Sequence, residues 1–479
     1  MYDYIIIGSG IIGSLIAREL SRYEITVLVV DKENDIASHQ TTANSAIIHS
    51  GHDPKVGSLK AKLCVEGNKL YDELEEELSI PLLRTGAFVV VHGKDEEYAL
   101  DELYQRAIQN GVSELKMLSG DEVRYEEPLL NDSITKALSL PTTKVTYPWE
   151  VAIAAMSNAI KNGVEFRRNS EVIHLEKEND IFTVTLSNHE KLYAKNIINA
   201  AGVMSDQIAH MLENDIPFKI TPRRGEYLVL DRKAKGLFSH VIYPLPTKRG
   251  KGVLIVPQVH GNILLGPSSE NQMSTHQATT TYQGLTYIKD SIMKMTSHIP
   301  YGLIIRTFAG IRATSTYDDF YIKESTHYSH FYHVAGIDSP GLTAAPAIAK
   351  YLIHDILGIT SPLKTNFDPR RKKPIVFYDL PEQERLEMIK NNPKYGNIIC
   401  KCEKITEQEI IDAIHGPTGN DTVKGIKKRA RAGSGLCQGG YCEGLVLKII
   451  AREKGMKLSD VNYYHENTQI LKKETKAHD

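Results

Sequence analysis

The chain has 479 residues, 41% of them hydrophobic, and its 57 Lys and Arg nearly balance its 59 Asp and Glu, giving a formal net charge of −2. This length predicts two to four domains with substantial cores, and the balanced charge argues against a nucleic-acid partner. No apolar stretch reaches the ~20 residues that span a bilayer, and the start MYDYIIIGSG lacks the basic segment of a secretory signal. We therefore expect a cytoplasmic protein with no membrane span of its own, in which any membrane association would be through a partner.

A glycine-rich loop follows the first predicted strand. Residues 3–7 (DYIII) predict that strand, GSGIIG follows from Gly8 to Gly13, and helical spacing comes next. Glycines allow the tight turn, and the helix N-terminus offers free N–H groups to a pyrophosphate. Residues 25–32 predict a second strand that ends at Asp31, where a ribose-binding carboxylate is expected. The pattern predicts a dinucleotide-binding unit, with an ordinary βαβ unit as the alternative, and it does not decide between FAD and NAD.

Three later segments favour FAD. Residues 195–209 predict a buried strand that ends in Ala-Ala-Gly and continues into a helix, and residues 331–357 predict another strand, glycine turn and helix. Between the first loop and these segments, residues 165–198 have the alternation of a small antiparallel meander. In this order the segments resemble the FAD-dependent amine and hydroxy-acid oxidase superfamily, which includes D-amino acid oxidase and glycerol-3-phosphate dehydrogenase. The resemblance covers about residues 1–365.

A run of small polar residues precedes His49. The side chains that can donate hydrogen bonds to a planar cofactor without bulk are those of Thr41, Thr42, Asn44 and Ser45. Removing a hydride from a secondary alcohol requires a base for the hydroxyl proton, and an imidazole suits that role. One histidine among eighteen more often has a structural or surface role, but NSAIIHSG resembles the superfamily's segment whose histidine lies beside the flavin. We predict that His49 is the catalytic base and that His52 lies at the rim.

Two basic residues predict an anionic substrate. Residues 247–270 predict two strands with Lys251 leading the first, and FAGIR places Arg312 just after Gly310. A guanidinium binds a carboxylate or phosphate with two hydrogen bonds, and a lysine adds a point charge. The alternative is that both are solvated. These segments resemble the short glycerol-3-phosphate oxidases, whose matching Lys and Arg hold the substrate phosphate, while RGEY at 224–227 is shared with the L-2-hydroxyglutarate oxidases.

Four of the five cysteines lie in the last fifth of the chain, and the fifth, Cys64, is expected to be packed in a core. The four are spaced as two close pairs, Cys400 with Cys402 and Cys437 with Cys442. Two pairs of thiolates fit either a [2Fe-2S] cluster or tetrahedral zinc. Glycine-rich loops around them favour the cluster, because their N–H groups can point at sulfide. This segment resembles the bacterioferritin-associated-ferredoxin-like domain.

Together these resemblances imply an α/β fold with a Rossmann-type FAD-binding domain, an inserted α+β substrate domain and a small C-terminal helical cysteine-cluster domain. The expected boundaries are 1–85, 146–215 and 326–365 for the FAD-binding domain, 86–145 and 216–325 for the substrate domain, 366–397 for a linker, 398–460 for the [2Fe-2S] domain and 461–479 for a frayed tail. The cofactor-binding residues that the resemblance implies are Gly8, Gly10, Ile12, Gly13, Asp31, Lys32, Thr41, Thr42, Asn44, Ser45, Val172, Ala201, Gly202, Gly310, Gly336, Gly341, Leu342 and Thr343.

The joined flavin and cluster predict a dehydrogenase, because an oxidase would return its electrons directly to oxygen. We expect sn-glycerol 3-phosphate to be oxidised to dihydroxyacetone phosphate. Electrons would then pass one at a time through the cluster to an electron-acceptor protein or a second flavoprotein subunit. The alternatives are oxidation of L-2-hydroxyglutarate or another anionic hydroxy acid, a non-catalytic electron-transfer subunit, and an oxidase stapled by zinc.

Overall fold

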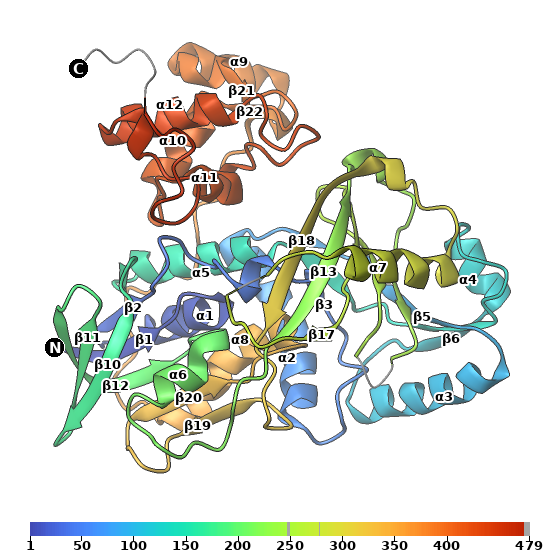
Figure 1. Cartoon of the computed structure of the whole chain (residues 1–479), viewed down its shortest axis with the longest axis horizontal. Coiled ribbons are helices and arrows are strands. Elements are labelled where there is room, and N and C mark those ends of the chain that lie inside the picture. Colours follow the sequence, from blue (N-terminus) through green and yellow to red (C-terminus); the bar gives the residue numbers. More distant parts are fainter. Residues whose placement is uncertain (247–249, 277, 474–479) are drawn as a thin grey trace. The chain divides into compact units, whose positions relative to one another are not determined.

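A computed structural model describes residues 1–246, 250–276 and 278–473, and the chain divides into two compact units (Figure 1). The first unit comprises Met1–Lys32 and Ile36–Arg370, and the second comprises Glu33–Asp35 and Arg371–Asp479. The expected strand segment 247–270 and tail 461–479 fall partly outside the described residues, at 247–249 and 474–479.

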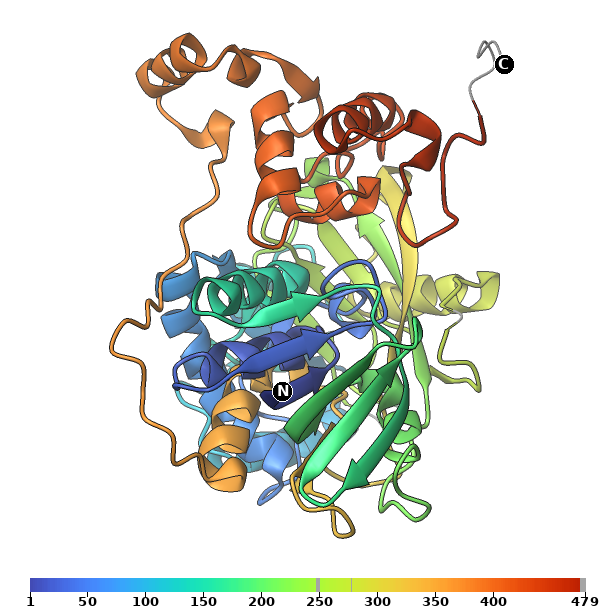
Figure 2. The same ribbon diagram turned by 90° about the vertical axis from the view of Figure 1, so that its left-hand side faces the viewer.

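The first sheet has a parallel centre. Its strands, in spatial order, are β9 (Glu165–Arg167), β2 (Val27–Val30), β1 (Tyr2–Ile7), β12 (Lys191–Asn199) and β20 (Phe331–Ala335). Antiparallel strands extend it, and these are β10 (Val172–Glu178), β11 (Ile181–Leu186) and β19 (Tyr321–Glu324) (Figure 2). Residues 4–7 of β1 are buried on both faces, as expected for a parallel sheet with cover on each side. The meander predicted from residues 165–198 is confirmed for β10 to β12.

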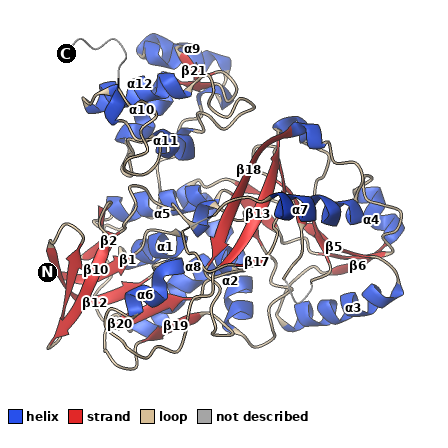
Figure 3. Cartoon of the chain, viewed as in Figure 1, coloured by secondary structure: helices blue, strands red, loops and turns tan. Residues whose placement is uncertain are grey.

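Helices bury one face of this sheet (Figure 3). They are α1 (Ile11–Leu20), α2 (Leu59–Leu78), α5 (Pro148–Lys161) and α8 (Gly341–Tyr351). Ile6, Val27 and Val29 pack against these helices in one continuous core. The other face packs against residues of β10, β11 and the short helix α6 (Ser205–Ala209). The strand–turn–helix units predicted at residues 3–20, 195–209 and 331–357 are therefore all present.

The second sheet is largely antiparallel. Its spatial order is β17 (Glu270–Asn271), β13 (Arg223–Leu230), β16 (Ile263–Gly266), β15 (Leu254–Pro257), β14 (Val241–Pro244), β5 (Ala87–Val91), β7 (Lys136–Ser139) and β6 (Lys116–Ser119), with β18 (Ile304–Arg312) also paired to β13. Phe88 and Val90 of β5 face α4 (Gly120–Glu126) and α7 (Tyr282–Met295), whereas the alternate residues face α3 (Lys94–Gln109). This sheet provides the α+β layer expected between the flavin segments.

A small three-stranded sheet lies within the first unit. It pairs β8 (Lys144–Thr146) with β3 (Ile47–Ile48) and with β4 (Leu82–Leu83), both antiparallel. Strand β3 ends immediately before His49. In the residues that the structure describes, no helix is both long and apolar enough to cross a bilayer.

The second unit is a small helical domain with its own core. Its elements are α9 (Glu382–Asn391), β21 (Ile398–Cys400), β22 (Ile405–Thr406), α10 (Glu407–His415), α11 (Val423–Ala430) and α12 (Glu443–Lys454). Helix α10 begins with a capping box, in which Thr406 and Glu409 satisfy each other's backbone N–H groups. The range 366–397, expected as a linker, contains α9. The buried core includes Ile399, Ile410 and Ile450.

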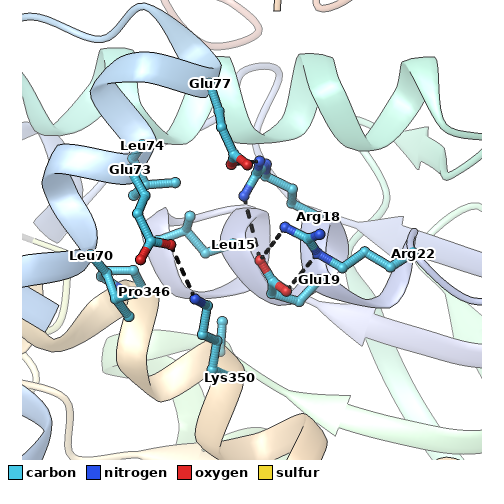
Figure 4. Close-up of a pocket in the computed structure, with 11 residues that line it drawn as sticks. Leu15, Arg18, Glu19, Arg22, Leu70, Glu73, Leu74, Glu77, Pro346 and Lys350 are labelled. Carbon is cyan, nitrogen blue, oxygen red and sulfur yellow. Dashed lines mark hydrogen bonds and ion pairs between the residues drawn. The ribbon is translucent and has the colours of Figure 1, made fainter. Parts of the chain in front are cut away.

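A charged network closes a pocket between α1, α2 and α8 (Figure 4). Arg18 of α1 is 2% exposed, forms ion pairs with Glu19 and Glu77, and donates from Nε to Asn158 Oδ1 at 3.2 Å. Lys350 of α8 pairs with Glu73 of α2 in the same pocket. The pocket contains none of the predicted site residues, and Arg18 serves to hold α1 against α2 and α5.

Replacing Arg18 should destabilise the first unit more than replacing an exposed arginine. Breaking a buried pair leaves a buried charge uncompensated and costs about 3–5 kcal/mol. We expect Arg18→Met to lower the free energy of unfolding by that order. Arg84→Met is the matched control, because Arg84 also pairs with two carboxylates but is 54% exposed, and it should cost less than ~1 kcal/mol. Equal losses in urea titrations of the two variants would contradict this role for Arg18.

Candidate active site

The loop between β1 and α1 has the form of a phosphate cradle. Gly8 has φ +109°, and a Cβ on it would lie 2.6 Å from the carbonyl oxygen of Ala200. A Cβ on Gly13 would lie 2.0 Å from the carbonyl oxygen of Gly8. Only glycine fits both positions. Gly10 caps α1 without a side-chain hydrogen bond, so first-turn N–H groups can face a phosphate.

Asp31 lies against this loop at the end of β2. Its Oδ2 accepts hydrogen bonds from the backbone N–H of Ser9 at 2.6 Å and from Ser9 Oγ at 2.7 Å. The Asp31 carboxylate therefore holds the loop between β1 and α1 in place. It also lies at the strand end where a ribose-binding carboxylate is expected. Ile12 lies within the first turn of α1, Lys32 follows Asp31, and Val172 is the buried first residue of β10.

The polar run before His49 mostly stabilises its own turn. Thr41 Oγ1 accepts from the N–H of Ile11 at 3.1 Å, which ties the run to the start of α1. Thr42 Oγ1 donates to the carbonyl of His39. The amide of Asn44 donates to the carbonyls of Gln40 and Thr41 and accepts from Ala46 N–H, while Ser45 Oγ lies 3.5 Å from Tyr227 Oη.

The remaining predicted cofactor residues lie at two other strand ends and on β18. Ala201 and Gly202 follow β12, Gly336 follows β20 with φ +66°, and the first three residues of α8 are Gly341, Leu342 and Thr343. Gly310 on β18 has a packing reason, because a Cβ there would lie 2.1 Å from the carbonyl oxygen of Ala43. Their contacts with a cofactor remain predictions.

His49 is 8% exposed and is held by three elements. Its N–H donates to Thr343 Oγ1 at 2.8 Å, its carbonyl accepts from Asn68 Nδ2 at 3.0 Å, and its Nδ1 lies 2.9 Å from Tyr243 Oη. Burial, then the charge of Lys251, holds the pKa of His49 well below its ordinary value. The imidazole is therefore neutral near pH 7 and can accept a proton.

Tyr243 was not predicted from the sequence. Alternation along β14 places Val241 and Tyr243 on the face that packs with Ile47, whereas Ile242 packs on the opposite face. Burial raises the pKa of Tyr243 well above its ordinary value, so the phenol stays protonated. No local signal marks this tyrosine, because its contact with His49 depends on how two sheets meet.

Lys251 joins the His49 cluster. Its Nζ is buried, has no hydrogen-bond partner in the described part of the chain, and lies 4.0 Å from Asp53 Oδ2. His52, expected at the rim, is instead 1% exposed, so that expectation is wrong. Arg312 lies on β18, donates from Nη2 to the carbonyl of Ser268 at 3.4 Å, and packs beside Gly225.

The four C-terminal cysteines lie together as two pairs. The sulfur atoms of Cys402 and Cys437 are 3.7 Å apart, and Cys400 and Cys442 are hydrogen-bond partners. That partner, with the backbone N–H groups of Gly433 and Glu403, lowers the pKa of Cys400 to about 6, while the N–H groups of Tyr441 and Gly439 lower that of Cys437. Within the described residues, no group of three or more His, Cys, Asp or Glu side chains is arranged to hold a single metal ion.

N–H groups that point at cysteine sulfur favour the thiolate form, which is the form that ligates iron. The paired arrangement fits a [2Fe-2S] cluster, since each iron takes two cysteine ligands. Three cations of the basic run at 424–433 form ion pairs. Lys428 and Arg429 pair with the buried Asp35, and Arg431 pairs with Glu403.

Comparison with known proteins gives the family. The model of the FAD dependent oxidoreductase family matches residues 3–354. The chain belongs to this family. A second model, the BFD-like [2Fe-2S] binding domain, matches residues 398–452. The protein is thus a flavin-dependent oxidoreductase that binds FAD and carries a [2Fe-2S] cluster.

Three relatives illustrate the likeness. A glycerol 3-phosphate dehydrogenase of Caloramator mitchellensis is 42% identical over 100% of this chain and 99% of its own length. The FAD-bound L-α-glycerophosphate oxidase of Mycoplasma pneumoniae is 29% identical, with a TM-score of 0.75 over 78% of this chain and 99% of that one. A mitochondrial L-2-hydroxyglutarate dehydrogenase of Caenorhabditis briggsae is 29% identical over 74% of this chain and 93% of its own.

Adding one methyl group to the cradle should weaken FAD binding. In Gly13→Ala the new Cβ collides with the Gly8 carbonyl, so the loop must move, and we expect about tenfold or greater loss of FAD affinity. Gly302→Ala is the control, because a Cβ there meets nothing within 4 Å. Flavin absorbance per chain after purification and titration of the apoprotein with FAD measure the effect. Unchanged affinity in Gly13→Ala would refute the cradle.

Removing either cysteine of the Cys402–Cys437 pair tests the cluster. Cys402→Ser and Cys437→Ser should each lose iron and labile sulfide yet retain flavin, because the two centres belong to different units. Cys64→Ser should retain both, since burial raises the pKa of Cys64 to about 12 and leaves it a packed thiol. Metal and sulfide analysis of protein purified without oxygen is the measurement. Zinc without iron in the unaltered protein would contradict the cluster assignment.

Proposed function

We propose that the protein is an FAD-dependent dehydrogenase that oxidises sn-glycerol 3-phosphate to dihydroxyacetone phosphate and passes the electrons through its [2Fe-2S] cluster to a protein partner. The observation that carries this proposal is the match to the Caloramator dehydrogenase, which extends over both units of the chain. The oxidase and hydroxyglutarate relatives match 78% and 74% of the chain. Full-length similarity favours the substrate that this dehydrogenase is named for.

His49 has the properties of the proton acceptor in this reaction. Oxidation of a secondary alcohol to a ketone removes a hydride from carbon and a proton from oxygen. Bound FAD supplies the hydride acceptor. For Nε2 of His49 to take the proton, Nδ1 must carry hydrogen and donate it to Tyr243 Oη. The hydrogen bonds from Asn68 and to Thr343 fix the backbone of His49, so the ring is held in place before substrate binds.

Lys251 and Arg312 are the proposed ligands of the substrate phosphate. Lys251 brings to the His49 cluster an ammonium that has no hydrogen-bond partner among the described residues and lies 4.0 Å from Asp53, and its charge also helps to keep His49 neutral. Arg312 extends from the strand whose Gly310 contacts the run preceding His49. Two cations, one from the bend before β15 and one from β18, suit a dianionic head group.

The [2Fe-2S] unit is the proposed outlet for electrons. A hydride carries two electrons, whereas this cluster accepts one at a time, so the second unit converts a two-electron oxidation into single-electron transfers. A protein acceptor, or a second flavoprotein subunit, is the corresponding partner.

Anaerobic titration with glycerol 3-phosphate should bleach the flavin and then reduce the cluster. His49→Gln should slow flavin reduction by about 10²-fold or more, the usual contribution of a general base. In the unaltered protein the rate should stay constant through neutral pH and fall only under acid conditions, because the pKa of His49 is lowered and protonation removes the base. His174→Gln is the control, since His174 is exposed on β10.

Other outcomes identify the competing functions. Bleaching by L-2-hydroxyglutarate in place of glycerol 3-phosphate would assign the hydroxy acid as substrate. Failure of every anionic alcohol to bleach the flavin, with unchanged partner-linked activity in His49→Gln, would assign a non-catalytic electron-transfer subunit. Bleaching of the flavin without reduction of the cluster would refute the electron outlet.

A further inference from the structure

His52 is buried next to the proposed base and lacks a side-chain hydrogen bond in the part of the chain that the structure describes. Its side chain is 1% exposed, and within the described residues neither ring nitrogen has a hydrogen-bond partner. The nearby Nζ of Lys251 is in the same condition. Buried polar atoms are nearly always paired, because leaving them unpaired costs the free energy of their lost hydration. Three such atoms in one place indicate a missing polar ligand.

The surroundings select the charge of that ligand. Lys251 and Arg106 contribute positive charge around His52, and Asp53 contributes negative charge. The carboxylate of Asp53 lies 4.0 Å from Lys251 Nζ, and Arg106 donates to the backbone carbonyl of Asp53 at 3.3 Å, so two cations and one carboxylate surround His52. An anion would complete the balance, and it would accept hydrogen bonds from both Lys251 and His52.

His52 also differs from His49 in what fixes it. The Nδ1 of His49 is engaged by Tyr243 Oη at 2.9 Å, whereas His52 contacts the same tyrosine only through its ring, edge-on, with centroids 5.6 Å apart. Tyr243 therefore contacts both histidines, one with an oriented ring and one with both nitrogens available to a ligand. This arrangement can divide proton transfer and anion binding between them.

We propose that His52 binds the phosphate group of the substrate together with Lys251. This inference rests on the proposed function and adds a phosphate ligand to it. His52 donates an N–H to a phosphate oxygen, and Lys251 donates from Nζ to another. Burial and the charge of Lys251 hold the pKa of the unliganded His52 to about 3. A bound dianion opposes both effects, so binding should draw a proton onto His52.

Four nearby groups affect the protonation of His52. Lys251 and Arg106 lower the pKa of His52, Asp53 raises it, and His49 is a neighbouring imidazole. His49 and Tyr243 are both kept uncharged by burial near neutral pH. Proton uptake that disappears in a His52 variant but persists in the His49→Gln variant would therefore belong to His52.

The test uses inorganic phosphate as the probe and the FAD-loaded protein as the sample. Calorimetric titration in two buffers of different ionisation heat gives both the dissociation constant and the protons taken up. We expect the unaltered protein to take up protons, and His52→Gln and His52→Asn to bind phosphate about tenfold more weakly without that uptake. For glycerol 3-phosphate, KM should rise by the same factor while the limiting rate of flavin reduction changes about twofold or less. His174→Gln should match the unaltered protein.

The result that overturns the proposal is unchanged phosphate affinity and KM in a folded His52→Gln or His52→Asn variant. Phosphate binding without proton uptake in the unaltered protein, measured at a pH where free phosphate is already the dianion, would also refute the protonated phosphate ligand, and this measurement needs no variant. Failure of the proposed function looks different. Glycerol 3-phosphate would then leave the flavin oxidised, while phosphate binding would still depend on His52.

Discussion

The burial of His49 in a fixed hydrogen-bond frame is the constraint on which the rest of the site depends. Its backbone is held by Thr343 of α8 and Asn68 of α2, and its ring by Tyr243 of β14. Removing water from the imidazole lowers its pKa, and the two backbone bonds prevent the ring from moving toward solvent. A neutral base is obtained without a carboxylate partner because three elements of the first unit meet at one residue.

The same packing explains why glycine is required where backbones cross. Gly8 and Gly13 allow β1, α1 and the end of β12 to approach without side chains between them, and Gly67 does the same for α2 against the Thr343 carbonyl. Because Thr343 also bonds His49, the close approach of α2 to α8 places the start of α8 beside the base. The predicted cofactor cradle and the proposed proton acceptor are thus parts of one packed frame.

The sequence predicted the strand–glycine–helix units and the segment around His49, since these depend on local periodicity and short motifs. It did not predict Tyr243 or Asn68, because their contacts with His49 join residues 194 and 19 positions apart and depend on sheet pairing. The alternation within VIYP predicts that Tyr243 and Val241 lie on the same face of the strand. It does not predict that Tyr243 contacts His49. His52 was misplaced because it stands at a position where the resembled family varies, which suggested the rim, whereas the fold buries it.

The cysteines of the second unit show a related coupling between fold and chemistry. Cys400 and Cys442 lie in the hydrophobic core with Ile410 and Val446, whereas Cys402 and Cys437 are less buried. Ligands embedded in a core make cluster binding part of the folding free energy of that unit, since losing the metal leaves two thiols without a partner of comparable strength. The N–H groups around Cys400 and Cys437 favour the thiolate forms that ligate iron. Two of the proposed cluster ligands, Cys400 and Cys442, therefore also help to hold the core of this unit together.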